Sequence, residues 1–178
     1  MATRKEIWME VLEWAQAIIL AVIIAYLIRA FVFTLVLVDG PSMQPTLETG
    51  DRLFVTRLLY QPKQGDVVVF KPANDPSHRY VKRVIATSGQ KIDIDYSSST
   101  VYVDDVALDE PYIKEQLLTI RGDVTLPAIV PEDSIFVMGD NRNNSRDSRR
   151  SEVGMVKKST IIGKAVLRFW PFKEFTTL

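Results

Sequence analysis

The hydrophobic positions of this chain form one long run near the amino terminus and only short runs after it. Residues 14–38 are apolar with few interruptions, chiefly Gln16, Arg29 and Thr34. A run of this length can cross a bilayer core, which is about 30 Å thick. The pattern therefore predicts one transmembrane anchor with its juxtamembrane segment over residues 14–38, preceded by a short amino-terminal segment over residues 1–13.

Charged residues set the expected limits and direction of this anchor. Arg29 at the bilayer centre would cost about 3 kcal/mol, so we expect its side chain at an interface and the helix end near Ile28. Arg4 and Lys5 precede the run, and positive charge marks the cytoplasmic side. We therefore expect a single-pass protein of the cell membrane, with a cytoplasmic amino terminus and an extracytoplasmic domain over residues 39–178.

Two other interpretations of the same run stay open. A cleavable signal peptide also begins with basic residues, but this run is long for its apolar region and no small-residue cleavage site follows it. The other is a buried helix in the core of a soluble protein. The near-continuous apolar character favours a retained anchor over both.

Beyond Gly40 the apolar positions fall in short runs that are typical of β-strands. Turn residues separate these runs, and no long helical period follows the anchor. The sequence thus predicts one mainly β, mostly antiparallel domain over residues 39–178. The expected strands are Leu53 to Val55, Val67 to Phe70, Tyr80 to Ala86, Lys91 to Asp95, Val101 to Val103, Ile135 to Met138 and Val166 to Trp170.

Composition narrows the classes of function. The 178 residues carry 22 Lys or Arg and 22 Asp or Glu, so no net charge favours binding to nucleic acid. Arg146, Arg149 and Arg150 still form a local cluster that is a candidate binding patch. The absence of cysteine excludes disulfides, thiol catalysis and thiolate metal sites, and the one histidine, His78, cannot build a multi-histidine metal centre.

Ser42 lies in the segment Asp39 to Leu47, between a Gly-Pro pair and Pro45. Proline fixes its own φ and biases the preceding residue toward extended geometry, so this loop would present Ser42 in a defined direction. An ordinary proline-rich turn is the competing interpretation, and it is the better one when the segment is taken alone.

Lys82 lies in the expected strand Tyr80 to Ala86, where alternation places Lys82 and Arg83 on opposite faces. A lysine can act as a general base only if burial lowers its pKa from about 10.4, whereas an arginine stays protonated. The competing interpretation is a solvent-facing lysine on an edge strand. Alternation alone does not say which face is inside.

A polar segment, Gly139 to Arg149, follows another expected strand. It is either a solvated surface loop or a support for a catalytic group. In the second case, Ser145 would hydrogen-bond the lysine amine and hold its lone pair toward the nucleophile. Asp147 would pair with Arg149 or Arg142 and so fix the loop.

In this order, the motifs closely resemble those of type I signal peptidases of the bacterial Ser-Lys class. The match includes the apolar anchor, the Ser42 loop, Gly65 to Phe70, the Lys82 strand and Gly139 to Arg149. The resemblance implies a signal-peptidase or LexA-like β ectodomain behind one transmembrane helix. A single span is more typical of the Gram-positive members.

The resemblance also implies a mechanism that needs no cofactor and no metal. Ser42 would attack the scissile carbonyl after Lys82 takes its proton, and water activated by the same lysine would hydrolyse the acyl-enzyme. Ser145 matches the serine that orients the lysine. Asp147 and Arg149 match the structural ion pair of the family.

The oxyanion hole is where this sequence departs from part of the family. The Ser42 backbone N–H matches one donor. Some members place a serine two positions before the nucleophile to supply the second donor, whereas this chain has Gly40. The second donor is therefore not identified from the sequence.

Family substrates are secretory preproteins, cleaved after small residues in an Ala-x-Ala pattern beside the lipid bilayer. The implied function is a membrane-bound serine endopeptidase that removes amino-terminal signal peptides. Three alternatives stay open: another Ser-Lys processing peptidase, such as one for pilin precursors, a Ser-His enzyme that uses His78, and an inert membrane-tethered β module that binds a partner.

Overall fold

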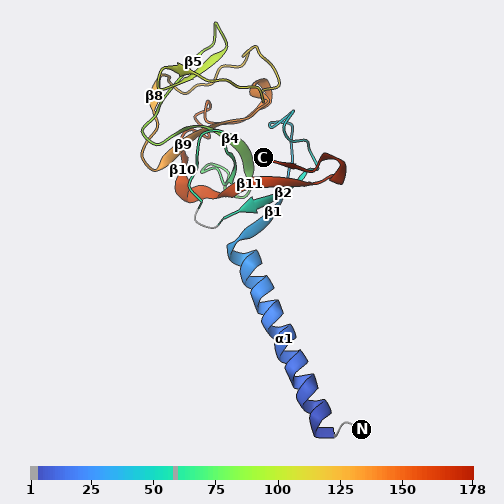
Figure 1. Ribbon diagram of the computed structural model, residues 1–178. Helices are drawn as coiled ribbons and strands as arrows, with labels where there is room; N and C mark the ends of the chain where they lie inside the picture. Colours follow the sequence, from blue (N-terminus) through green and yellow to red (C-terminus); the bar gives the residue numbers. More distant parts are fainter. Residues whose placement is uncertain (1–3, 58–59) are drawn as a thin grey trace.

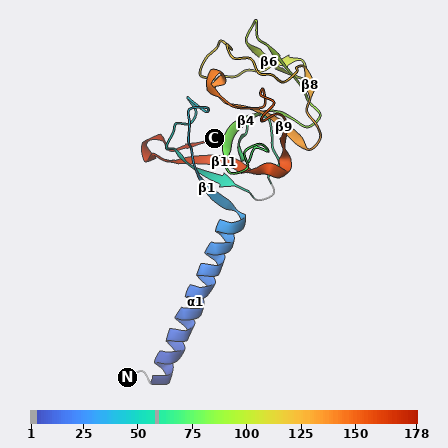
Figure 2. The same cartoon turned by 180° about the vertical axis from the view of Figure 1, so that it is seen from behind.

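One helix projects from a body built of β-strands (Figures 1 and 2). The computed structural model describes residues 4–57 and 60–178, apart from the side chains of residues 6–7 and 27–31. Helix α1 (Arg4–Phe31) contains the segment Trp8–Tyr26, which is long and apolar enough to cross a membrane. None of that segment is buried against the protein, so the core-helix interpretation is wrong.

The helix ends at Phe31, about one turn beyond the predicted end near Ile28. The intervening residues include Arg29 and Ala30, which have high helix propensity, and a charged side chain does not interrupt the backbone hydrogen bonds of a helix. The side chain of Arg29, predicted to lie at an interface, is outside the described residues.

All strand pairs are antiparallel, and they form two sheets. The larger sheet has the order β1-β2-β11-β3-β4-β9-β10, with β12 also paired to β11, and the smaller has the order β7-β6-β5-β8. The prediction of a mainly β, mostly antiparallel domain behind one amino-terminal helix is confirmed. The strands are β1 (Phe33–Leu37), β2 (Arg52–Thr56), β3 (Val67–Phe70), β4 (Tyr80–Thr87), β5 (Lys91–Asp95), β6 (Thr100–Val103), β7 (Val106–Ala107), β8 (Ala128–Ile129), β9 (Ser134–Met138), β10 (Val156–Lys157), β11 (Ile161–Trp170) and β12 (Thr176–Thr177), and the 3-10 helices are η1 (Arg142–Asn144), η2 (Lys158–Thr160) and η3 (Phe172–Glu174).

Each of the expected strands lies within an observed strand. The two-residue strands β7, β8, β10 and β12 were not expected, and neither was the longer strand β1. Its residues continue the apolar run of the helix, so the sequence pattern assigned them to the anchor and its juxtamembrane segment. In the structure they pair with β2, with Leu35 opposite Phe54 and Val36 opposite Leu53. The chain therefore passes from helix to sheet within the segment 14–38.

The loop that carries Ser42 is fastened to the core on both sides of that residue. Met43 and Leu47 are 1% and 0% exposed, and they pack with Val36, Val38 and Leu53 in one apolar cluster. Burying these two side chains removes most of the freedom that a solvent-exposed loop would have. The β1–β2 pair thus positions Ser42 through its packing.

We expect Leu53→Ala to lower the free energy of unfolding by about 2–5 kcal/mol, because it leaves a cavity in this cluster. The same substitution at Leu35, which is 58% exposed on the paired strand, is expected to change it by less than about 0.5 kcal/mol. Urea unfolding in detergent, followed by circular dichroism, measures both. Equal effects of the two substitutions would contradict the described packing.

Candidate active site

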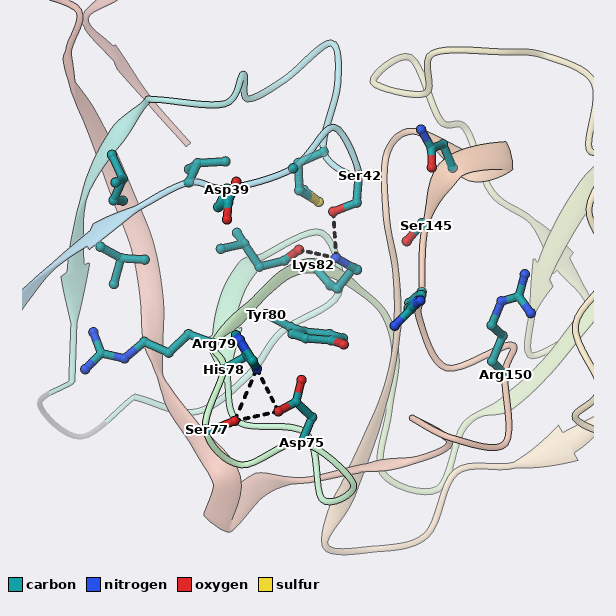
Figure 3. A pocket seen from close by; sticks show the side chains of 18 of the residues that line it. Asp39, Ser42, Asp75, Ser77, His78, Arg79, Tyr80, Lys82, Ser145 and Arg150 are labelled. Atoms are coloured by element: carbon teal, nitrogen blue, oxygen red, sulfur yellow. Dashed lines mark hydrogen bonds and ion pairs between the residues drawn. The ribbon is translucent and has the colours of Figure 1, made fainter.

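The side chain of Ser42, in the loop after β1, and the side chain of Lys82, in strand β4, point toward each other (Figure 3). Lys82 Nζ lies 2.7 Å from Ser42 Oγ and 2.8 Å from the Val81 carbonyl oxygen, with a hydrogen bond to each. Ser42 is half-buried and Lys82 is 4% exposed. Since β4 pairs with β3 on one side and β9 on the other, the edge-strand interpretation of Lys82 is wrong.

The surroundings of Lys82 favour its neutral form. Burial lowers the pKa of Lys82 to about 8, although the negative charges of Asp147 and Asp140 act in the opposite direction. At pH 7 a lysine with this pKa is neutral in about a tenth of the molecules, against fewer than one in about a thousand for an ordinary lysine. A neutral amine at hydrogen-bond distance from a serine hydroxyl is able to accept its proton.

Backbone contacts from the segment 139–149 hold the Ser42 loop in place. Asn141 donates from its backbone N–H to the Ser42 carbonyl oxygen at 3.0 Å and from Nδ2 to the Pro41 carbonyl oxygen at 3.1 Å. A Cβ at Gly139 would overlap both the Ser42 carbonyl oxygen and Ser145 Oγ, so only glycine permits this close approach. Sequence reasoning missed the contribution of Asn141, since an asparagine in a polar loop carries no distinguishing signal.

Ser145 lies beside Lys82 in the same cleft (Figure 3). The expected hydrogen bond between Ser145 and the lysine amine is not present among the described residues, where the amine bonds instead to Ser42 Oγ and the Val81 carbonyl. The backbone carbonyl next to Lys82 is the nearer partner, and alternation along a strand gives no sign of it. Ser145 Oγ is buried and meets no hydrogen-bond geometry in the described part of the chain, although its hydroxyl is close enough to Asp147 to help lower the pKa of that carboxyl. Its role as orienter of the lysine stays a prediction.

Asp147 and Arg149 form a buried two-point ion pair. Arg149 Nε and Nη2 each lie 2.9 Å from a carboxylate oxygen of Asp147, and the two side chains are 3% and 0% exposed. Burial alone would raise the pKa of Asp147, but hydrogen bonds and charge from Arg149 outweigh it and hold that pKa below its ordinary value. Arg142, the other partner considered for Asp147, pairs instead with Glu110.

A second buried ion pair, which the sequence did not reveal, joins the strand of Lys82 to the Ser42 loop. Arg83 Nε and Nη2 lie 2.9 and 2.7 Å from the two carboxylate oxygens of Asp140. Thr46, in the Ser42 loop, donates its hydroxyl to Asp140 at 2.5 Å. The alternation signal placed Arg83 opposite to Lys82, but its partner is 57 positions away and no local pattern identifies it.

Ser42 and Lys82 line a cleft of about 890 Å³. Three parts of the chain form its walls: residues 36–43, residues 75–82 and residues 143–150. Ile120 also lines it. Ser42 belongs to the first of these walls and Lys82 to the second, and both face the third wall, which carries Ser145 and Arg150 (Figure 3). A cleft of this size accommodates several residues of an extended peptide across the reacting atoms.

His78 is part of this cleft but makes other contacts. Its Nδ1 lies 2.7 Å from Asp75 Oδ1 and 3.2 Å from Ser77 Oγ, and the side chain is 73% exposed. Within the described residues the ring has no hydrogen bond to Ser42. This geometry disfavours the interpretation of a Ser-His enzyme.

The backbone beside Ser42 offers one unoccupied donor. The Ser42 N–H donates to no backbone acceptor in the described part of the chain, while its carbonyl accepts from Asn141. Gly40 has a φ of +97°, which glycine adopts without strain, and its N–H donates to Thr49 Oγ1 at 3.2 Å. The Gly40 N–H is thus engaged, and the geometry identifies no second donor.

Comparisons with known proteins identify the family of this chain. The family model described as signal peptidase, peptidase S26, matches residues 11–170. A signal peptidase I of Bacillus licheniformis is 40% identical over 91% of this chain and 90% of that protein. A signal peptidase IB of Staphylococcus aureus (strain COL) is 36% identical over 93% of both. The crystal structure of a signal peptidase I from Enterococcus faecalis V583, 27% identical, covers 59% of this chain and 97% of that one, with a TM-score of 0.48.

The resemblance that the motifs indicated is thereby confirmed, including the similarity to Gram-positive members. The family model spans most of the chain, and the two bacterial relatives match nearly end to end. This chain belongs to the signal peptidase, peptidase S26, family and is a serine endopeptidase.

Proposed function

We propose that this protein is a membrane-anchored signal peptidase that removes amino-terminal signal peptides from secretory preproteins, with Ser42 as nucleophile and Lys82 as general base. The observation that carries the proposal is the buried Lys82 amine, 2.7 Å from the Ser42 hydroxyl oxygen. A lysine held in this way has a lowered pKa and a nucleophile within reach of its lone pair. Homology to signal peptidases supplies the substrate class.

The proposed reaction has two halves. Neutral Lys82 accepts the Ser42 proton while Ser42 Oγ attacks the carbonyl carbon of the scissile peptide bond. The lysine ammonium then donates that proton to the leaving amine, and Ser42 is left esterified to the signal peptide. Water, deprotonated by Lys82 once it is neutral again, hydrolyses the ester and regenerates the Ser42 hydroxyl.

The surrounding groups stabilise this geometry. The Ser42 backbone N–H, which donates to no backbone acceptor among the described residues, is proposed as one donor to the oxyanion. The Asp147–Arg149 pair is proposed as a structural support, since it contacts the backbone of Gly139 and lies beneath the loop that holds Ser42. Ser145, whose buried Oγ has no partner among the described residues, is proposed to orient the amine when substrate fills the cleft.

The proposed substrate binds as an extended chain in the cleft. Strand β1 is the terminal strand of the larger sheet, and residues 36–38 line the cleft beside Ser42. An extended peptide is able to pair with such a strand through its backbone, and the side chains next to the scissile bond then face the protein. Small residues in an Ala-x-Ala pattern fit this arrangement, because the cleft floor there is formed by packed apolar side chains.

The anchor is proposed to be α1, crossing the cell membrane with Arg4 and Lys5 on the cytoplasmic side. The β body then lies outside, next to the bilayer surface. Enzyme and preprotein on the same surface have a raised effective concentration, so the cleft need not bind the substrate tightly. A processing peptidase for pilin precursors would use the same chemistry. An inert β module would leave without explanation a buried lysine that forms no ion pair within the described residues.

Three substitutions test the nucleophile and the base. Ser42→Ala, Lys82→Ala and Lys82→Arg are each expected to abolish cleavage of a preprotein by the purified protein in detergent. The first removes the nucleophile, the second removes the base, and the third replaces it with a side chain that stays protonated. Gel analysis of the cleaved preprotein provides the measurement.

His78→Ala serves as the matched control for these variants, and we expect it to retain turnover because the ring bonds Asp75 and Ser77. Turnover by the Lys82→Arg enzyme would refute the base assignment. If the wild-type protein cleaves no preprotein, the inert-module interpretation holds instead.

The pH dependence of kcat/KM reports the protonation of Lys82 in the free enzyme. The active form is the neutral amine, and burial lowers its pKa to about 8. Activity is therefore expected to rise about tenfold per pH unit below that value and to level off above it. A peptide substrate without ionisable groups near the scissile bond isolates this effect, and a flat profile across the same range would contradict a lysine base.

The structural role of the buried ion pair is tested by Arg149→Ala. The variant leaves Asp147 buried without its partner, which is expected to lower the free energy of unfolding by about 3–5 kcal/mol. Arg146→Ala, an exposed arginine of the same loop, is the matched control, with an expected change under about 0.5 kcal/mol. Urea unfolding in detergent measures both, and equal small changes would show that the pair has no structural role.

A further inference from the structure

Two arginines belong to the loop 143–150, and one of them, Arg150, lies on the far side of Ser145 from Lys82 (Figure 3). Arg146 and Arg150 both line the cleft, and both are exposed. Figure 3 shows Arg150 and Arg79 on opposite sides of Lys82, with Ser145 between Lys82 and Arg150. The cleft therefore has a separate cationic end that the proposed reaction does not use.

The charges at this end are available to a ligand. Arg150 has no side-chain hydrogen bond or ion pair within the described residues, and the contact of Arg146 is a 3.9 Å approach to exposed Glu152. The nearby carboxylate of Asp123 binds Ser151 with both oxygens. These hydrogen bonds, and to a smaller extent the charge of Arg150, hold the pKa of Asp123 below its ordinary value, so Asp123 stays ionised but already has partners.

The position of the cleft relative to α1 indicates which part of a substrate reaches these arginines. Helix α1 contacts β1, and β1 leads directly into the wall of residues 36–43. The segment 142–150, coloured orange, lies farther from α1 than β1 does in both views (Figures 1 and 2). A preprotein whose signal peptide emerges from the bilayer would thus lay the residues before the scissile bond along the β1 wall.

The residues after the scissile bond, here called the leaving segment, then lie along the loop 143–150. We infer that Arg146 and Arg150 form a subsite for acidic side chains of the leaving segment, so that preproteins with Asp or Glu soon after the cleavage site are preferred. This inference rests on the proposed function, because it assumes that a peptide substrate is bound across Ser42. It assigns a specificity role to residues that take no part in bond cleavage.

The size of the preference follows from the exposure of the two arginines. Exposed pairs of opposite charge contribute about 0.2–1 kcal/mol each, which corresponds to a preference of about 1.4- to fivefold in kcat/KM. Exposed charges are screened by salt, with a Debye length that falls to about 3 Å at 1 M ionic strength. The preference should therefore fade as salt is added, whereas a preference based on shape would not.

The test compares peptides that differ only by Asp or Asn at one of the first four positions of the leaving segment. For the wild-type enzyme in low salt, the ratio of kcat/KM for Asp over Asn is expected to be about 1.4 to 5 at one or two positions. It should approach one in high salt and in the double variant Arg146→Gln, Arg150→Gln. Because the readout is a ratio within each enzyme, a change in overall rate or in the amount of folded protein cancels.

Arg79→Gln is the matched control, since Arg79 is an exposed arginine at the opposite end of the same cleft. It is expected to keep the wild-type ratio for the leaving segment. A ratio of one at all four positions, or a ratio that survives the double substitution, would overturn the subsite while leaving the proposed function intact. Cleavage of no peptide by the wild-type enzyme would instead refute the proposed function and the subsite with it.

Discussion

The burial of one lysine amine next to one serine hydroxyl is the constraint on which this structure depends. A lysine is useful as a base only when it loses its proton near neutral pH, and it does so only where water is scarce. Placing Lys82 on β4, an interior strand of the larger sheet, provides that environment. Ser42, the proposed nucleophile, must at the same time be accessible to a peptide. It therefore lies on a loop at the edge of the buried region.

Several of the buried polar side chains fix that loop. Asn141 donates hydrogen bonds to two carbonyl oxygens of the loop. Asp140 accepts hydrogen bonds from Thr46 of the loop and from Arg83. The Asp147–Arg149 pair contacts the segment that provides these groups, since Asp147 accepts a hydrogen bond from the Gly139 N–H. Buried ion pairs are weak contributors to net stability, but removing one partner is costly. Such pairs therefore suit a site in which the position of a loop matters more than the overall stability of the fold.

The sequence predicted those features that depend on local pattern. Alternation located β4 and the strands around it, and the order of the motifs identified Ser42 and Lys82 as the residues to examine. It did not reveal contacts between distant segments, such as the bond from Asn141 to Pro41, 100 positions apart. Strand β1 was missed for another reason: its residues are as apolar as those of the helix before it, and the sequence has no boundary between the two elements.

That continuous passage from α1 into β1 has a geometric consequence. If α1 is anchored in a bilayer, as proposed, the few residues of β1 set the height of Ser42 above the lipid surface. A substrate anchored by its own apolar helix can present only those peptide bonds that reach the same height. The length of β1 would then determine how far from the membrane a peptide bond must lie to reach Ser42. The cleavage site would be selected by this distance as well as by the side chains at the scissile bond.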